Sequence, residues 1–243
     1  MSGAVTVTLA SDGALEVTLD RPGDGNVLTP DMTEALAAAF AHPPAEARFI
    51  VLSGTGPDFC AGRQSPMPPA DARPTAADIR RAVADPVLDF YATVRAVPLP
   101  VIAVVRGRAF GVGCALAGLA DLVIAADSAR FCVPEMDRDI PPLLVMTALQ
   151  DRLSRAALAR LVLGREPVGG REAVALGLAG MSVPDDALDD AVATQRARLS
   201  ANSDTVLRTV KRFLNAGPEA SFATRRELAA AAIAAATTER YAR

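Results

Sequence analysis

The chain has 243 residues, of which 51% are hydrophobic and 4% aromatic, and its formal net charge is -3. This length suits one large domain, or one domain with an appendage, and the charge gives no general attraction to nucleic acids or anionic membranes. No uncharged apolar stretch is long enough to span a membrane, and no basic segment precedes an apolar one at the N-terminus. We therefore expect a protein without a membrane span or a secretory signal.

The histidine and cysteine content excludes several kinds of site. His42, the single histidine, precedes two prolines in an expected loop, so a histidine-rich metal site is excluded and a serine or cysteine hydrolase would lack a convergent base. The three cysteines at 60, 114 and 132 fit neither a disulfide framework nor a zinc site. We expect no metal, and the reducing cytoplasm is the simplest compartment for such a chain.

The first fifty residues contain two expected strands, a helix and a third strand. Alternating apolar residues predict a hairpin of strands over 5–9 and 15–19, with a glycine turn between them. Thr29 suits a helix N-cap and Pro30 the first helical position, so we expect a helix that ends near Phe40. The apolar run at 49–53 is the next expected strand.

Strands and helices continue to alternate in the middle of the chain. Residues 65–75 are rich in proline, which excludes a regular helix and leaves a pocket wall, a lid or a plain surface loop. A helix is expected over 75–97, bent at Pro86, and another over 112–119. Strands are expected over 101–105, 121–126 and 130–133, so the pattern predicts an α/β fold with parallel pairing.

The last hundred residues are predicted to be mostly helical. Helices over 185–199, 204–214 and 219–238 lead us to divide the chain into an α/β core, residues 1–184, and a helical region, residues 185–243. The second of these helices has apolar residues at helical spacing, namely Val206, Val210, Phe213 and Leu214. We expect them to pack on the core, and the alternative is that they form a subunit interface. The run 228–236 has no polar face and should be covered by something.

Two short glycine-bearing segments carry the strongest chemical signal. Residues 59–63 (FCAGR) and 107–114 (GRAFGVGC) each follow an apolar strand. Glycine lets the backbone bend where a side chain would block approach, so two such bends can aim two N–H groups at one oxygen. That arrangement is an oxyanion hole, which stabilises charge developing during reaction. Leu116 breaks the GxGxxG pattern, so this is not a dinucleotide loop.

These segments, with others in the same order, resemble the crotonase (enoyl-CoA hydratase/isomerase) superfamily over most of the chain. The matching stretches are LDRP and NVL at 19–28, FCAG at 59–62, GRAFGVGC at 107–114, ADLVIA at 120–125, FCVPE at 131–135, and the helix 204–214 with Lys211. The resemblance implies a spiral of ββα units with a C-terminal helical trimerisation region. It also implies a homotrimer or dimer of trimers, an acyl-CoA substrate, and no cofactor beyond the coenzyme A of that substrate.

The resemblance also implies roles for particular residues. Glu135 is expected to move the proton, and the N–H groups of Ala61 and Val112 to hold the thioester oxygen. Asp139 is expected either as a second acid or as the cap of a helix near Pro141. The residues expected to contact the substrate or its coenzyme A are Arg21, Val27, Cys60, Gly62, Arg63, Phe110 and Gly111, with Arg106 as a further partner for the phosphates.

Two departures from the family pattern bear on the reaction. Val112 stands where glycine is usual, and Ala115 stands where hydratases carry a second glutamate. A single carboxylate suffices to move a double bond, so isomerisation is favoured and hydration stays open. The alternatives are a decarboxylase or lyase, and a non-catalytic acyl-CoA-binding subunit. Cys60 and Cys114 flank the expected donors, as a nucleophile or, more simply, as small buried filler.

Overall fold

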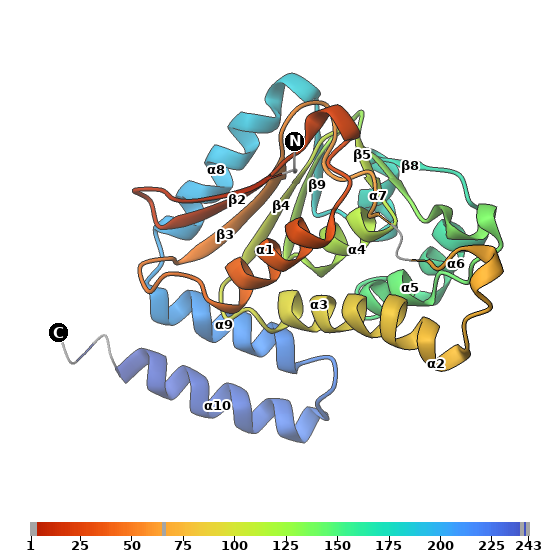
Figure 1. The fold of residues 1–243 in the computed structure, drawn as a ribbon. Helices are drawn as coiled ribbons and strands as arrows, with labels where there is room; N and C mark the ends of the chain where they lie inside the picture. Colours follow the sequence, from red (N-terminus) through yellow and green to blue (C-terminus); the bar gives the residue numbers. More distant parts are fainter. Residues whose placement is uncertain (1–3, 65–66, 239–240, 242–243) are drawn as a thin grey trace.

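The computed structural model describes residues 4–64, 67–238 and 241, and it is built around a six-stranded sheet (Figure 1). The strand order is β1-β2-β3-β4-β6-β9, with bounds Ala4–Leu9, Ala14–Asp20, Phe49–Gly54, Val101–Val105, Leu122–Ala126 and Met181–Val183. β1 and β2 form the expected antiparallel hairpin, and the other neighbours are parallel. Ser65 and Pro66 of the proline-rich stretch lie outside the described residues.

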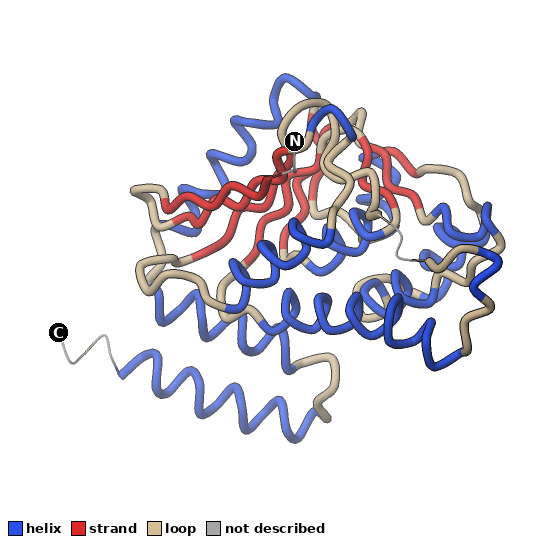
Figure 2. Tube along the Cα trace, in the orientation of Figure 1, coloured by secondary structure: helices blue, strands red, loops and turns tan. Residues whose placement is uncertain are grey.

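The central strands of the sheet are buried on both faces, because their consecutive apolar residues point to opposite sides. Ile50 and Leu52 of β3 join the larger apolar core, whereas Phe49 and Val51 join a smaller core on the opposite face. The larger core lies under α1 (Pro30–Ala41), α3 (Asp85–Ala96) and α4 (Val112–Leu119), and α8 (Leu188–Ser200) covers the other face (Figures 1 and 2). A parallel sheet covered by helices on both faces is the α/β arrangement that the pattern predicts.

A second, three-stranded sheet holds the chain that follows β4. Its order is β5-β7-β8, with bounds Arg108–Phe110, Arg130–Cys132 and Val168–Gly169. The helices near it are α5 (Leu143–Leu149), α6 (Arg155–Leu163) and α7 (Gly170–Leu176). Short 3-10 turns connect the elements: η1 (Pro22–Asp24), η2 (Ala70–Ala72), η4 (Pro134–Arg138) and η5 (Asp185–Ala187). Because β5 leads directly into α4, this sheet positions the second glycine bend.

The helix expected over 75–97 forms as three consecutive segments. They are α2 (Ala76–Ile79), a π-helical turn η3 (Arg80–Ala84) and α3, in whose first turn Pro86 lies. Proline has no N–H to donate, so the regular hydrogen-bond pattern is interrupted at this point. The expected bend at Pro86 therefore corresponds to a change of helix type.

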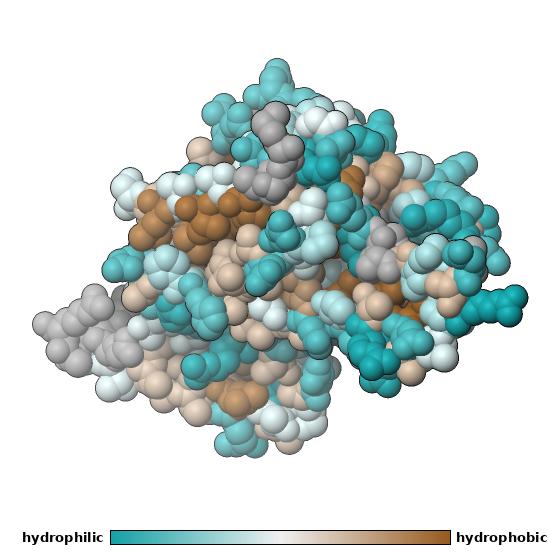
Figure 3. Space-filling model, viewed as in Figure 1, coloured by the Kyte–Doolittle hydropathy of each residue, from teal (hydrophilic) through white to brown (hydrophobic). Residues whose placement is uncertain are grey.

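The C-terminal region consists of α8, α9 (Asp204–Ala216) and α10 (Phe222–Thr238), close to the three expected helices. Core packing is the wrong interpretation for Val206, Val210 and Leu214 of α9, because all three side chains are exposed. α10 has no buried residue and packs on α9 at the edge of the molecule (Figure 1). Apolar surface therefore stays open along α10 and over the β1–β2 hairpin (Figure 3).

One buried ion pair anchors α9 to the main sheet. The Lys211 side chain is 2% exposed, and its Nζ donates to both carboxylate oxygens of Asp121 at 2.9 Å. Asp121 Oδ2 also accepts from the Val101 N–H at the start of β4 at 2.7 Å. A buried ammonium group needs such a carboxylate partner, so the position of α9 is tied to the ends of β4 and β6.

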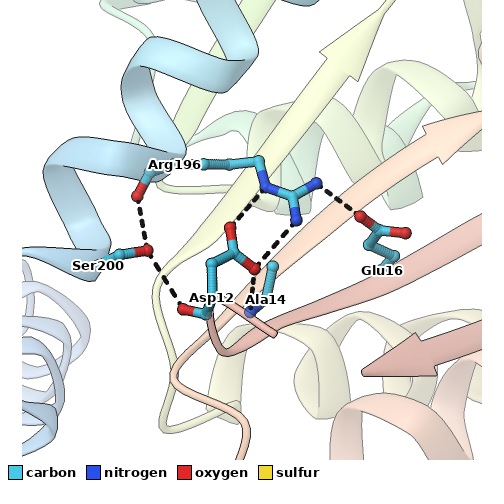
Figure 4. Close-up of polar contacts among 5 residues, drawn as sticks. All are labelled: Asp12, Ala14, Glu16, Arg196 and Ser200. Atoms are coloured by element: carbon cyan, nitrogen blue, oxygen red, sulfur yellow. Dashed lines mark hydrogen bonds and ion pairs between the residues drawn. The ribbon is translucent and has the colours of Figure 1, made fainter. Parts of the chain in front are cut away.

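An ion cluster around Arg196 fixes α8 to the hairpin turn (Figure 4). Its guanidinium donates to Asp12 at 2.9 and 3.0 Å and to Glu16 at 2.5 Å. Ser200, one turn further along α8, donates to the Asp12 carbonyl at 3.2 Å. The Arg196 hydrogen bonds hold the pKa of Asp12 below its usual value.

Among the helices of the described ranges, none is long and apolar enough to cross a membrane.

Candidate active site

A cavity of about 320 Å³ lies where the two glycine bends meet. Most residues expected to contact a substrate line it, namely Val27, Ala61, Gly62, Arg63, Phe110, Gly111, Val112 and Glu135. Met67 lines it too, so the proline-rich stretch forms a pocket wall at this residue, as one of the interpretations left open. The rest of the lining is largely aliphatic, which suits a site that takes an organic acyl chain.

The first bend is held between two neighbouring backbone segments. Cys60 donates its N–H to the Arg108 carbonyl at 2.9 Å and accepts from the Phe110 N–H at 2.9 Å. On the other side, the Leu28 N–H donates to the Gly62 carbonyl at 2.9 Å. Gly62 has a φ of +133°, which a larger side chain would adopt only with strain.

Ala61 does not offer the N–H group that the sequence assigned to it. Its N–H donates to the Gly25 carbonyl at 2.8 Å, so a bound oxygen would have to displace an existing backbone hydrogen bond. Arg63 is two residues further along the same extended segment. Within the described residues its N–H makes no hydrogen bond, since the bridge to Leu28 uses the Gly62 carbonyl and the Gln64 N–H. Arg63, and not Ala61, therefore has an N–H group free to bind an oxygen at this bend.

The side chain of Asn26 fixes the loop that accepts the Ala61 N–H. Asn26 is fully buried with a φ of +56°, and its Oδ1 accepts from the Arg21 N–H at 2.8 Å. Its Nδ2 donates to the carbonyls of Thr55 at 2.9 Å and Asp58 at 2.7 Å. One amide side chain thus joins the loop after β2 to the segment that enters the first bend.

The second bend places Val112 at the start of α4. Gly111 is the N-cap, with a φ of +53°, and its N–H donates to the Cys132 carbonyl at 2.9 Å. Val112 is the first helical residue, so its N–H has no partner within the helix and carries the positive end of the helix dipole. A β-carbon at Gly113 would lie 2.1 Å from the Cys60 carbonyl oxygen. That glycine is what allows the two bends to touch.

Glu135 extends into the cavity from η4, just after β7. A β-carbon at Gly111 would lie 3.0 Å from Glu135 Oε1, so the carboxyl group lies directly against the second bend. Oε2 is buried and has no hydrogen-bond partner among the described residues. Burial raises the pKa of Glu135, against smaller lowering effects that include the charges of Arg138 and Arg63. A buried carboxyl group with a raised pKa is suited to accept and return a proton near neutral pH.

Among the residues that the structure describes, no second acid accompanies Glu135 in this cavity. Asp139 is exposed, has a φ of +53° at the end of η4, and lies outside the lining. The expectation that Asp139 caps the next helix is wrong, because α5 begins at Leu143 without a side-chain cap. Ala115 is buried inside α4. Of the described residues that line the cavity, Glu135 is the one carboxylic acid.

The other expected site residues lie around the cavity or away from it. Arg21 pairs with Asp24 at 2.6 Å and also donates to the Val27 carbonyl at 3.2 Å, outside the lining. Arg106 pairs with the exposed Asp189 at 3.3 Å, likewise away from the cavity. Cys60 is fully buried, and burial raises the pKa of its thiol to about 12. A thiol with that pKa stays protonated at neutral pH, which favours the filler interpretation over a nucleophile.

Sequence reasoning missed Tyr91, which lies on α3 and lines the cavity. Its side chain is 4% exposed, and the hydroxyl is buried without a hydrogen-bond partner in the described part of the chain. Burial raises the pKa of this phenol far above its usual value, so the group is a neutral donor. Nothing in the sequence of the helix distinguishes Tyr91 from an ordinary core aromatic.

Comparison with known proteins gives consistent matches over nearly the whole chain. A family model described as "Enoyl-CoA hydratase/isomerase" matches residues 10–241. A Rhodobacter capsulatus protein named a probable enoyl-CoA hydratase is 32% identical over 208 residues, which are 85% of this chain and 79% of the relative.

Solved structures extend this likeness to three dimensions. An enoyl-CoA hydratase from Mycobacterium smegmatis superposes with a TM-score of 0.87 at 26% identity, covering 95% of this chain and 90% of that one. A Thermobifida fusca protein solved in complex with CoA gives a TM-score of 0.85 at 28% identity, covering 98% and 95%. The α/β fold with C-terminal helices that the motifs imply is thereby confirmed.

Proposed function

Because the chain belongs to the enoyl-CoA hydratase/isomerase (crotonase) family, we propose that it acts on an enoyl-CoA thioester and forms an enolate at the thioester carbonyl. The N–H groups of Arg63 and Val112 hold the carbonyl oxygen in this proposal, and Glu135 moves the proton. An oxyanion donor is worth roughly 10²–10³ in rate, or about 3–4 kcal/mol, because its full effect is reached only as negative charge develops.

The observation that carries this proposal is the carboxyl group of Glu135. It is the one acid among the described lining residues, its Oε2 is buried without a partner, and it lies against the bend that ends at Val112. Burying an unpartnered acid costs free energy, and an acid buried in this way beside a cavity is a candidate for a catalytic role. In the proposed reaction, Oε2 is the atom that accepts the proton from the substrate.

A single acid favours isomerisation over hydration. In the proposed reaction Glu135 removes a proton from the α-carbon of a 3-enoyl-CoA, and the electron pair spreads onto the thioester oxygen. The protonated Glu135 then returns the proton to the γ-carbon, which leaves a 2-enoyl-CoA and the original carboxylate. Adding water would require a second group to hold and deprotonate it, and the described lining residues offer no second carboxylate for this.

Isomerase assays with a matched pair of acid variants test this proposal. Converting a 3-enoyl-CoA to the conjugated 2-enoyl-CoA should be measurable by absorbance in the wild type. Glu135→Gln should lower kcat by about 10²–10⁴, the usual value of a general acid–base. Asp139→Asn, at the exposed acid four residues further on, should change kcat less than about twofold. Loss of activity in Asp139→Asn with retention in Glu135→Gln would contradict the assignment.

We also propose that the chain assembles as a trimer or a dimer of trimers through its C-terminal helices. Support comes from α9 and α10, on which Val210, Leu214 and Ile233 are each more than half exposed. Exposed apolar side chains on two adjoining helices are typical of a subunit interface.

A further inference from the structure

We propose that the acyl group of the substrate carries a carboxylate, and that the Arg63 guanidinium and the Tyr91 hydroxyl bind it. This inference rests on the function proposed above and names the class of substrate for the same cavity. It depends on side chains alone, whereas the Arg63 contribution to the oxyanion site depends on its backbone N–H.

The Arg63 guanidinium is a half-buried cation that forms no ion pair among the described residues, and the charge of Glu135 only partly offsets the effect of burial on its pKa. Its Nη2 reaches the Val83 carbonyl at 3.5 Å, the limit of a hydrogen bond, and within the described residues no carboxylate comes within ion-pair distance of it. Arg108, on the neighbouring strand, is by contrast paired with Asp58 at 2.7 Å. Burial lowers the pKa of Arg63, which means that the protein disfavours this charge as it stands. A bound anion would offset that cost.

The Tyr91 hydroxyl is a second buried group without a hydrogen-bond partner among the described residues, and Tyr91 lines the same cavity. Tyr91, Arg63 and Glu135 all line this cavity. A hydroxyl buried without a partner costs free energy that a ligand oxygen can recover. Tyr91 and Arg63 together offer a neutral and a charged donor, which matches the two oxygens of a carboxylate.

The overall charge of the cavity supports an anionic occupant. Its ionisable side chains with charge at neutral pH are Arg63, Arg138 and Glu135, two arginines against one acid, in a chain whose net charge is -3. Because Arg138 is exposed, water screens it, so the buried guanidinium of Arg63 is the stronger attractor. Val83 and Val87 line the cavity beside these donors, and they would pack against the methylene groups between the thioester and the carboxylate.

Binding of paired thioesters to the intact protein tests this inference. Calorimetry would compare succinyl-, glutaryl- and adipyl-CoA with 4-methylpentanoyl-, 5-methylhexanoyl- and 6-methylheptanoyl-CoA, in which an isopropyl group replaces the carboxylate. We expect at least one dicarboxylic thioester to bind about tenfold or more tighter than its branched partner, as charge-assisted hydrogen bonds provide. Arg63→Met and Tyr91→Phe should each reduce this ratio, and Arg138→Met should retain it.

Each other outcome overturns the inference in an identifiable way. Equal binding of the branched and the dicarboxylic thioesters at all three lengths would rule out recognition of a carboxylate on the acyl group. It would leave the proposed function intact. A ratio that survives in Arg63→Met, or that is lost only in Arg138→Met, would remove Arg63 from the recognition. Failure of every thioester to bind would overturn the proposed function as well. Tyr91→Phe removes a single oxygen, so it tests the hydroxyl without opening a cavity in the core.

Discussion

At the scale of single residues, Glu135 links activity and stability through its pKa. Burial raises the folded-state pKa above the ordinary value of 4.5. Above that raised pKa the carboxylate is charged in both the folded and the unfolded protein, and the folded protein bears the cost of burying it. Below pH 4.5 the group is protonated in both states and the cost disappears. Ionised Glu135 therefore destabilises the fold at neutral pH.

Glu135→Gln should consequently be more stable than the wild type at pH 8, although we expect its kcat to be much lower. Urea unfolding at several pH values would show the difference in midpoint shrinking as the pH falls toward 4. Asp139→Asn should show no comparable difference, since its side chain is exposed. A stability gain for Glu135→Gln that is constant across the pH range would contradict the buried-charge explanation.

In the first bend, the sequence predicted the segment that forms the site but not which of its N–H groups is free. The motif locates residues 59–63, but it does not show which N–H groups already donate to neighbouring backbone, because Gly62 with a φ of +133° breaks the regular alternation between Ala61 and Arg63. Only the pairing with Gly25 and Leu28 decides that Ala61 points into a backbone hydrogen bond and Arg63 does not. Sequence analysis did not identify Tyr91 for a related reason. Its place in the cavity lining depends on how α3 packs, and no local sequence pattern predicts that packing.

At the scale of elements, the N-cap of α4 holds the catalytic arrangement in register. Gly111→Ala would put a β-carbon 3.0 Å from Glu135 Oε1 and strain a residue with a φ of +53°. We expect a stability loss of about 1–2 kcal/mol from the backbone and a fall in kcat of about tenfold or more from displacement of the carboxyl group.

Gly177→Ala is the matched control for that substitution. Gly177 has a φ of +84°, and a β-carbon there would meet no atom within 4 Å. It should lose about 1 kcal/mol of stability, because the backbone is strained, with kcat unchanged. Steady-state kinetics and urea unfolding of both variants separate the two effects. An equal loss of kcat in both would show that Gly111 acts only through stability.

The Arg196 cluster should make the attachment of α8 sensitive to pH. Arg196→Met removes the hydrogen bonds that lower the Asp12 pKa, and we expect it to cost about 1–2 kcal/mol at pH 7. A lowered carboxyl pKa contributes stability above the unfolded value of 3.8, and this contribution is lost as the pH falls through the folded value. The difference between variant and wild type should therefore shrink toward pH 3.

Arg81→Met provides a surface comparison for the cluster. Arg81 pairs with Asp78 at 3.0 Å, but both side chains are more than half exposed. Its removal should leave the thermal unfolding midpoint nearly unchanged, because water screens the pair. If Arg196→Met cost no more than Arg81→Met at pH 7, the cluster would not secure α8.

Most elements were predictable because local signals and tertiary structure agree. The hairpin, α1, α4 and the three C-terminal helices follow from alternation, caps and glycines, which act within a few residues. The start of α5 was not predictable in this way. Asp139 resembles a cap in sequence, yet it ends η4 in a left-handed conformation, and Ile140 and two prolines separate it from Leu143. The division at residue 184 stays a prediction.

At the scale of the whole molecule, the open apolar face of α9 and α10 predicts self-association. Sedimentation should give a mass of three or six times the 25.2 kDa of one chain. Val210→Asp, at a side chain 53% exposed, should lower that mass without unfolding the chain, because the position is not in the core. Thr18→Asp, at a residue that lines a hollow against α8 and not against α9 or α10, should not reproduce the effect. A wild-type mass of one chain would contradict the trimer.

The central claim is that this fold makes an enolate with Glu135 as the base, and proton exchange in deuterated water tests it most directly. Acyl-CoA thioesters without a double bond would be incubated with the wild type and Glu135→Gln, and deuterium at the α-carbon measured by mass spectrometry. Our account predicts exchange by the wild type that the variant abolishes. Equal exchange by both proteins, or none by the wild type despite bound thioester, would contradict it.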